Sequence, residues 1–168
     1  GLNYIKFGGP KEWDLEPVVI SDLKKKEIER RTILIYTGVH RSSSDVQANV
    51  LIELKKKTKT MQRTIELARE CKEVLLRDSS LDEIGEMLAE SWSLKKAMNS
   101  HAITPELEYI WQKSQQAGAL GGKVLGAGGG GFFLFYVQPY EKLKLMKWID
   151  TQNLKFTPFV FEEKGLQS

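Results

Sequence analysis

A run of glycines between residues 118 and 131 is the part of this sequence whose composition best suits chemistry. It reads GALGGKVLGAGGGG and holds eight of the chain's 14 glycines. Glycine costs conformational entropy, so a folded chain concentrates it where the backbone takes positive φ or lies close to another group. Successive N–H groups in such a turn can converge on an anion. We therefore predict a phosphate-binding or active-site loop made of Lys123, Gly126, Ala127, Gly128, Gly129 and Gly130.

A flexible linker is the alternative for this segment. Linkers usually carry Ser or charged residues, whereas Val124, Leu125 and Ala127 are apolar and the segment leads directly into the apolar run FFLFYV. This difference favours a ligand-binding loop, in which the N–H groups from Gly126 onwards act as neutral donors. Lys123 keeps two interpretations, contact with a phosphate or a structural role with its stem along apolar surface.

The glycine-rich segment does not match the common nucleotide motifs. A P-loop needs Ser or Thr after its lysine, but Lys123 is followed by Val124. A dinucleotide fingerprint needs a strand before it and a helix after it, whereas the expected order here is helix, loop, strand. Both interpretations are therefore excluded.

A second group of polar residues follows a predicted buried strand. Arg41, Ser42 and Ser43 come just after TILIYT, and Arg and Ser suit the oxygens of a sugar phosphate. They are candidate substrate-binding residues. The alternative is a helix cap, for which Ser44 or Asp45 would serve.

Three more substrate-binding candidates share a predicted helix. Trp92 and Lys96 are four residues apart and so lie on one helix face, with Lys95 beside them. Either lysine could meet a phosphate, and Trp92 could instead belong to the core.

Composition excludes several classes of protein. The chain has 168 residues, 41% hydrophobic and 28% charged, with a net charge of +3, which is typical of a globular protein and gives little support for nucleic-acid binding. Cys71 is the single cysteine, so no internal disulfide and no metal site are expected. No apolar run reaches the ~20 residues that cross a bilayer. A cytoplasmic protein without a membrane partner is the prediction.

The elements that would position these residues follow from periodicity. Strands are expected at Leu2–Phe7, Pro17–Ile20, Thr32–Thr37, Phe132–Val137 and Leu154–Phe161, with a loop at Ser21–Arg31. Helical spacing covers Val46–Leu54, Met61–Leu75, a segment from Leu81 to Lys95, Thr104–Ala117 and Pro139–Thr151. Thr104 is the expected cap before Pro105. This order predicts an α+β fold of the ferredoxin-like kind, with helices packed on one face of an antiparallel sheet.

These motifs together resemble the GHMP kinases. Residues 118–131 followed by an apolar strand are similar to the third signature motif of that superfamily. YTGVHRSSSDV, SWSLKKAMNSHAITP and FVFEEKG resemble the branch that contains D-glycero-D-manno-heptose 7-phosphate kinase and the kinase part of fucose kinases. The likeness extends over nearly the whole chain.

The resemblance implies an ATP-dependent sugar kinase of two domains, of which this chain is the carboxy-terminal one. Residues 32–168 would form that domain, and residues 1–31 would complete or link to an amino-terminal domain, which is a partner of the site. ATP and Mg²⁺ would be held mainly there, and no catalytic residue is expected on this chain. The lack of an initiating Met and a strand pattern from the first residues also predict a start within a longer protein.

Several functional alternatives stay open. The resemblance implies phosphorylation of the anomeric hydroxyl of a sugar phosphate, heptose 7-phosphate above all, and a fucose- or galactose-type GHMP kinase is the enzymatic alternative. A non-catalytic ferredoxin-like module that binds a small anion is the alternative from another class. RNA binding would want exposed aromatics on central strands, which an apolar strand covered on both faces does not offer. A homodimer is a further possible arrangement.

Overall fold

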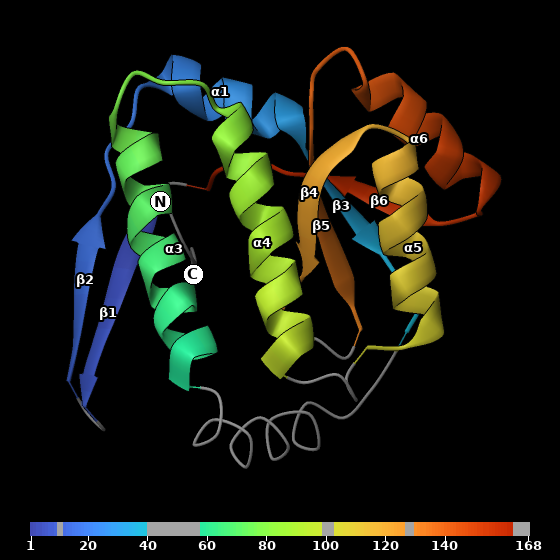
Figure 1. Cartoon of the computed structure of the whole chain (residues 1–168). Coiled ribbons are helices and arrows are strands. Elements are labelled where there is room, and N and C mark those ends of the chain that lie inside the picture. Colours follow the sequence, from blue (N-terminus) through green and yellow to red (C-terminus); the bar gives the residue numbers. More distant parts are fainter. Residues whose placement is uncertain (10–11, 40–57, 99–102, 127–129, 163–168) are drawn as a thin grey trace, which may run out of the picture.

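A four-stranded antiparallel sheet forms the centre of the computed structural model, which describes residues 1–9, 12–39, 58–98, 103–126 and 130–162. Its strands lie in the order β4 (Ala119–Val124), β5 (Phe132–Val137), β3 (Thr32–Tyr36) and β6 (Lys155–Pro158). β3 and β4 are separated by β5, which is antiparallel to both. This split arrangement is the ferredoxin-like topology, and it confirms the predicted α+β class (Figure 1).

The main core lies against one face of this sheet. Phe133 and Phe135 are fully buried and stack at 4.3 Å between ring centroids, and each pairs across the ladder with an isoleucine of β3. Helices α5 (Pro105–Gln116) and α6 (Lys142–Thr151) supply the opposing side chains. Thr104 caps α5 as expected, since its hydroxyl accepts from the Leu107 N–H at 3.3 Å.

A second, smaller core lies where α1, α3 and α4 meet. Strand alternation sends Tyr136 to the opposite side from Phe135, and there it joins side chains of α1 (Asp22–Arg31), α3 (Thr58–Leu76) and α4 (Asp82–Met98). α5 and α6 thus pack on one face of the sheet, as expected. α3 and α4 lie side by side (Figure 1), and α4 contacts the edge strand β4.

Residues 21–31 correct the sequence analysis, which expected a loop. They form α1, whose first turn is capped by the Ser21 hydroxyl accepting from the Lys24 N–H. Glu27 and Arg31 pair at 2.8 Å one turn apart, and Ile28 is buried. The polar composition hid a helix that is held by its cap, its charges and one apolar contact.

The first two strands form a separate hairpin rather than part of the main sheet. β1 (Asn3–Gly9) pairs antiparallel with β2 (Glu12–Pro17), and the hairpin lies beyond α3 in Figure 1. The expected strand at Pro17–Ile20 is therefore wrong, because only Pro17 belongs to β2. Val18 and Ile20 instead turn into the second core.

The remaining predicted elements are found with changed ends. α3 begins at Thr58, α6 begins at Lys142, and β6 is shorter than expected because Pro158, which lacks an N–H, ends it. The predicted helix at 46–54 lies outside the described residues. Among the helices of the described ranges, none combines the length and the apolar character that crossing a membrane requires.

Candidate functional site

The first half of the glycine-rich segment is a strand, which corrects the predicted loop. Ala119–Val124 form β4 along the edge of the sheet, paired with β5. The observed order is therefore helix, strand, turn, strand. A dinucleotide fingerprint is still excluded, because a strand rather than a helix follows the glycines.

Two glycines of β4 allow close contact between neighbouring backbones. A Cβ on Gly121 would lie 1.8 Å from the carbonyl oxygen of Gly85 in α4, and one on Gly122 would lie 2.5 Å from the carbonyl oxygen of Leu134. No side chain fits at these distances. The glycines of the strand therefore serve packing and bring α4 directly onto β4.

The second half of the segment is a turn at one end of the sheet. It begins with Gly126, which has φ +66° and is exposed, and closes with Gly130 (φ +143°) and Gly131 (φ +81°). Its base is closed by the Leu125 N–H, which donates to the Phe132 carbonyl at 2.8 Å. The predicted loop residues Ala127, Gly128 and Gly129 lie outside the described residues.

The segment after β3 holds the other side of this turn. The Gly131 N–H donates to the Val39 carbonyl at 2.9 Å, and both the N–H and the hydroxyl of Thr37 donate to the Gly131 carbonyl at 2.8 Å. A Cβ on Gly130 would lie 2.1 Å from the Val39 oxygen. The predicted substrate-binding residues 41–43 are outside the described residues. Val39, two residues before Arg41 in the chain, contacts the glycine turn.

Lys95 holds the turn from the helix side. From α4, its ammonium group donates to the carbonyls of Val124 at 2.8 Å and Gly126 at 2.7 Å. Burial, and to a lesser degree the charge of Lys123, lowers the pKa of Lys95 to about 8. The side chain acts on the backbone at the point where strand becomes turn.

Lys123 lies between the same helix and α3. Its ammonium group donates to the Ser91 hydroxyl at 2.9 Å, and burial lowers the pKa of this lysine. Burial also raises the pKa of the Cys71 thiol on α3, and the charge of Lys123 opposes that shift. The lysine is half-buried and bonded to Ser91, which fits the structural role, and its contact with a phosphate stays a prediction.

The other two candidates on α4 make their described contacts with the core and with α5. Trp92 has no exposed surface and packs against Phe133 at 5.1 Å between ring centroids, so its indole has no surface from which to touch a substrate. Lys96 pairs with Glu108 at 3.2 Å and lies over the Trp92 ring at 5.9 Å. Of the three helix candidates, Lys95 contacts the described residues of the glycine turn, and contact with a substrate stays a prediction for all three.

Sequence reasoning missed three residues of this arrangement, Thr37, Val39 and Ser91. The sequence predicts Thr37 only as the end of a strand. Its bonds to the turn go to the carbonyl of Gly131, 94 residues further along the chain, and no local pattern indicates them. Ser91 stands one helical turn before Lys95, and that spacing was the one signal that pointed to it.

The arrangement suits an anion rather than a metal ion. An exposed turn with positive φ values offers neutral N–H donors, and two half-buried lysines stand behind its start. Within the residues that the structure describes, no three His, Cys, Asp or Glu side chains gather as a metal site would need.

Comparison with known families gives this arrangement a class. Residues 72–144, which include α4, β4, the turn and β5, match the family of GHMP kinases C terminal. As the motifs predicted, this segment of the chain matches the carboxy-terminal domain of the GHMP kinases.

Comparison with individual proteins finds similarity to sugar kinases of that family. The chain is 30% identical over 170 residues to D-glycero-alpha-D-manno-heptose 7-phosphate kinase of Campylobacter jejuni, an alignment that covers 100% of this chain and 50% of the relative. The solved structure of a candidate sugar kinase from Campylobacter jejuni superposes with a TM-score of 0.73 at 29% identity, covering 97% of this chain and 46% of that one.

A heptose-phosphate kinase of known structure shares the fold. The D-glycero-D-manno-heptose 1-phosphate kinase of Bacteroides thetaiotaomicron superposes with a TM-score of 0.68 at 23% identity, covering 96% of this chain and 42% of that one. The chain thus spans about half the length of the relatives that it matches.

Proposed function

We propose that this chain is the carboxy-terminal half of an ATP-dependent sugar kinase, with the glycine turn at the edge of the phosphoryl-transfer site. The single observation that carries the proposal is the turn itself, where Gly126, Gly130 and Gly131 take positive φ and whose two ends are held by Lys95 and by Val39. Phosphoryl transfer is mainly positioning and charge stabilisation. A turn held at both ends that offers backbone N–H donors would suit that task.

The substrate class that we propose is a sugar phosphate, D-glycero-D-manno-heptose 7-phosphate, phosphorylated on its anomeric hydroxyl. Its support is the 30% identity to the heptose 7-phosphate kinase over the whole of this chain. Arg41, Ser42 and Ser43, which follow the Val39 that touches the turn, are the residues that we propose for the sugar phosphate, because guanidinium and hydroxyl groups suit phosphate oxygens.

In this proposal the residues of the chain position the transferred phosphoryl group and neutralise its negative charge. N–H groups of the turn, Gly126 to Gly130, would donate to oxygens of the transferred group. Lys95 fixes the start of the turn by its bonds to two carbonyls. Lys123, tied to Ser91, contributes positive charge from behind the strand.

ATP and Mg²⁺ belong to the same proposal. The turn fits the oxygens of a phosphate group, which is the chemistry that ATP would bring to the site. We propose that the remainder of the protein supplies the ATP-phosphate loop, the metal ligands and the base, and that the protein works in the cytoplasm. The chain by itself is then expected to be inactive.

The test is a substrate panel with the full-length protein. Heptose 7-phosphate, heptose, fucose and galactose are each offered with ATP and Mg²⁺, and ³¹P NMR follows the product. We expect a new anomeric phosphate on heptose 7-phosphate and much slower turnover of the neutral sugars. Turnover of fucose or galactose at a higher rate, or no ATP-dependent transfer to any of the four, would contradict the proposal.

A further inference from the structure

The β1–β2 hairpin shows an apolar outer face. Ile5 pairs with Leu15 and Phe7 pairs with Trp13 in the ladder, so all four side chains lie on the same face of the hairpin. Their exposed fractions are 46% for Ile5, 44% for Leu15, 82% for Phe7 and 65% for Trp13. We call these four residues the outer stripe.

The opposite face of the hairpin is polar and lies toward α3. Lys6 pairs with Asp14 at 3.6 Å and with Glu16 at 3.4 Å. Lys72 of α3 bonds to the Glu16 carboxylate at 2.5 Å and lies 5.0 Å from the centre of the Tyr4 ring. The hairpin thus turns its charged face to its own domain and its apolar face outward, the reverse of the usual pattern for a half-solvated sheet.

The base of the hairpin fixes the direction of the outer stripe. Val18 and Ile20 are buried in the second core, and the Val18 N–H donates to the Leu2 carbonyl at 3.0 Å. The Gly1 nitrogen donates to the Glu162 carbonyl at 2.7 Å.

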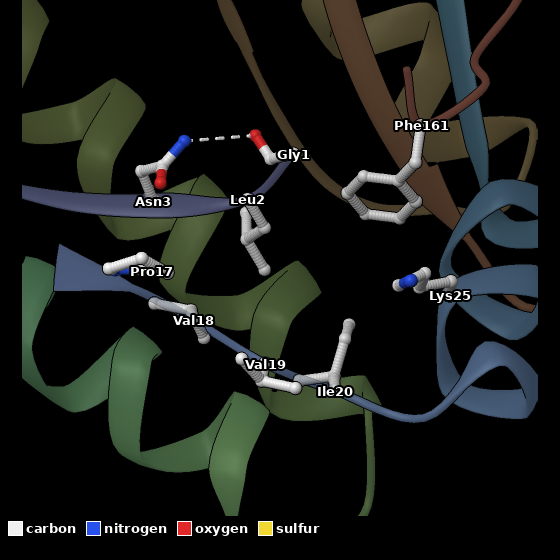
Figure 2. A pocket seen from close by; sticks show the side chains of 9 residues that line it. All are labelled: Gly1, Leu2, Asn3, Pro17, Val18, Val19, Ile20, Lys25 and Phe161. Carbon is white, nitrogen blue, oxygen red and sulfur yellow. Dashed lines mark hydrogen bonds between the residues drawn. The ribbon is translucent and has the colours of Figure 1, made fainter. Parts of the chain in front are cut away.

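The same base carries a small cavity of about 220 Å³. Figure 2 shows it between the hairpin, Lys25 of α1 and Phe161. None of the described residues of the glycine turn lines it, so the outer stripe and its base form a region separate from that part of the candidate site.

An exposed apolar stripe of this kind indicates a surface that another part of the protein or a partner buries. A two-stranded hairpin is marginally stable by itself in water, and contiguous exposed apolar side chains mark a contact surface. On the described part of the chain, β1 and β2 pair only with each other, so nothing there completes the hairpin.

We infer that the outer stripe is the docking surface for the remaining domain of the same polypeptide. This inference rests on the proposed function, in which the chain is one half of a larger kinase. The chain covers 50% of the heptose 7-phosphate kinase and 46% of the similar solved structure. A domain of about the same size is therefore available as the occupant, and the hairpin lies outside the segment that matches the carboxy-terminal family.

The area of the stripe favours a tethered domain over a second copy of the chain. With about 150–250 Å² for a whole aromatic side chain, the four exposed side chains offer roughly 500 Å². Stable complexes of separate molecules bury about 800 Å² on each partner. A domain in the same chain needs less, because a short linker gives it an effective concentration in the mM range.

Hydroxyl-radical footprinting of the full-length protein, without substrate, tests this inference. The oxidation rates of Phe7 and Trp13 are each divided by the rate in the unfolded protein and compared with Tyr140, a matched control that is 78% exposed. We expect protection of Phe7 and Trp13 that exceeds that of Tyr140 by about fivefold or more, as a buried interdomain contact requires, at every protein concentration.

Two results would overturn the inference. One is protection of Phe7 and Trp13 no greater than that of Tyr140. The other is protection that rises with concentration together with a dimer in sedimentation, which would assign the stripe to a second copy. Because no substrate is present, either result leaves the substrate panel to decide the proposed function by itself.

Discussion

The glycines of β4 and the glycines of the turn that follows it stand a few residues apart and serve different physical ends. Gly121 and Gly122 are needed because backbone atoms of α4 and β5 lie where a Cβ would be. At Gly126, an added Cβ would meet no atom within 4 Å, and glycine is favoured there because the backbone has a φ of +66°. Gly130 meets both demands, since it has positive φ and lies against Val39.

This difference separates stability from function within one motif. The strand glycines join α4 to the sheet and so belong to the fold. Gly126 gives the start of the turn an exposed backbone at positive φ, which we propose is presented to a ligand. A substitution in each half should therefore give a different kind of defect.

The largest effect is expected from Gly121→Ala. The new Cβ would overlap the Gly85 carbonyl oxygen, which is backbone and cannot swing away. We expect a loss of about 3 kcal/mol or more in the free energy of unfolding, at the upper end for overpacking. Urea denaturation of the full-length protein measures it, and a loss below that of Gly126→Ala would contradict the packing role.

A smaller loss is expected from Lys95→Met. The carbonyls of Val124 and Gly126 would lose their ammonium donor, at a cost of about 1–2 kcal/mol at pH 7. Lys95→Arg, which keeps the charge and N–H donors, is the matched control and should restore part of the stability. Equal stability of Lys95→Met and the wild type would show that the two bonds from Lys95 to the Val124 and Gly126 carbonyls do not stabilise the fold.

The same lysine gives a pH dependence of known sign. Its pKa is about 8 in the folded protein against 10.5 for the free group, so the unfolded chain binds more protons between these values. Stability therefore gains from the titration of Lys95 as pH rises. We expect the stability of the wild type relative to Lys95→Met to increase from pH 8 to pH 10, measured by urea denaturation, and a constant difference would contradict the shifted pKa.

The next effect in size is that of Gly126→Ala on stability. No atom lies within 4 Å of the new Cβ, so the cost is that of a left-handed backbone, about 1 kcal/mol. Denaturation in urea checks this value. A loss as large as that of Gly121→Ala would erase the distinction between the two halves of the motif.

The smallest effect is expected from Lys96→Met. Its pair with Glu108 is partly exposed, and such surface pairs contribute about 0.5 kcal/mol or less. Sugar phosphorylation by the full-length protein should stay within about twofold of the wild type, since the described bonds of Lys96 go to Glu108 and a surface pair of this kind changes stability only slightly. A much larger loss of activity would return Lys96 to the substrate-binding residues.

Elements whose signals are local could be predicted from the sequence. FFLFYV gave β5 with its observed bounds, and Thr104 with Pro105 gave the start of α5. α1 was missed because its polar run resembles a loop, although Ser21 and the Glu27–Arg31 spacing were visible signals.

The errors at the site come from contacts that no local pattern encodes. β4 was expected as part of a ligand-binding loop because its glycines suggested positive φ or close approach to a ligand. Gly121 is instead required by the close approach of Gly85, which lies 36 residues earlier in the chain. Likewise, helical spacing placed Trp92 and Lys95 near each other without showing which would point into the core. Only the packing of α4 on β4 decides that Lys95 reaches the turn.

The central claim is that the glycine turn, rather than the strand before it, belongs to the phosphoryl-transfer site. The most direct measurement is kcat per folded enzyme for Gly126→Ala in the full-length protein with heptose 7-phosphate. Gly118→Ala is the control, because Gly118 also has positive φ but stands at the opposite end of β4. We expect kcat to fall about 10- to 100-fold in Gly126→Ala, since small displacements of positioning groups are costly, and to stay near the wild-type value in Gly118→Ala. Wild-type kcat in Gly126→Ala, or equal losses in both variants, would contradict the account.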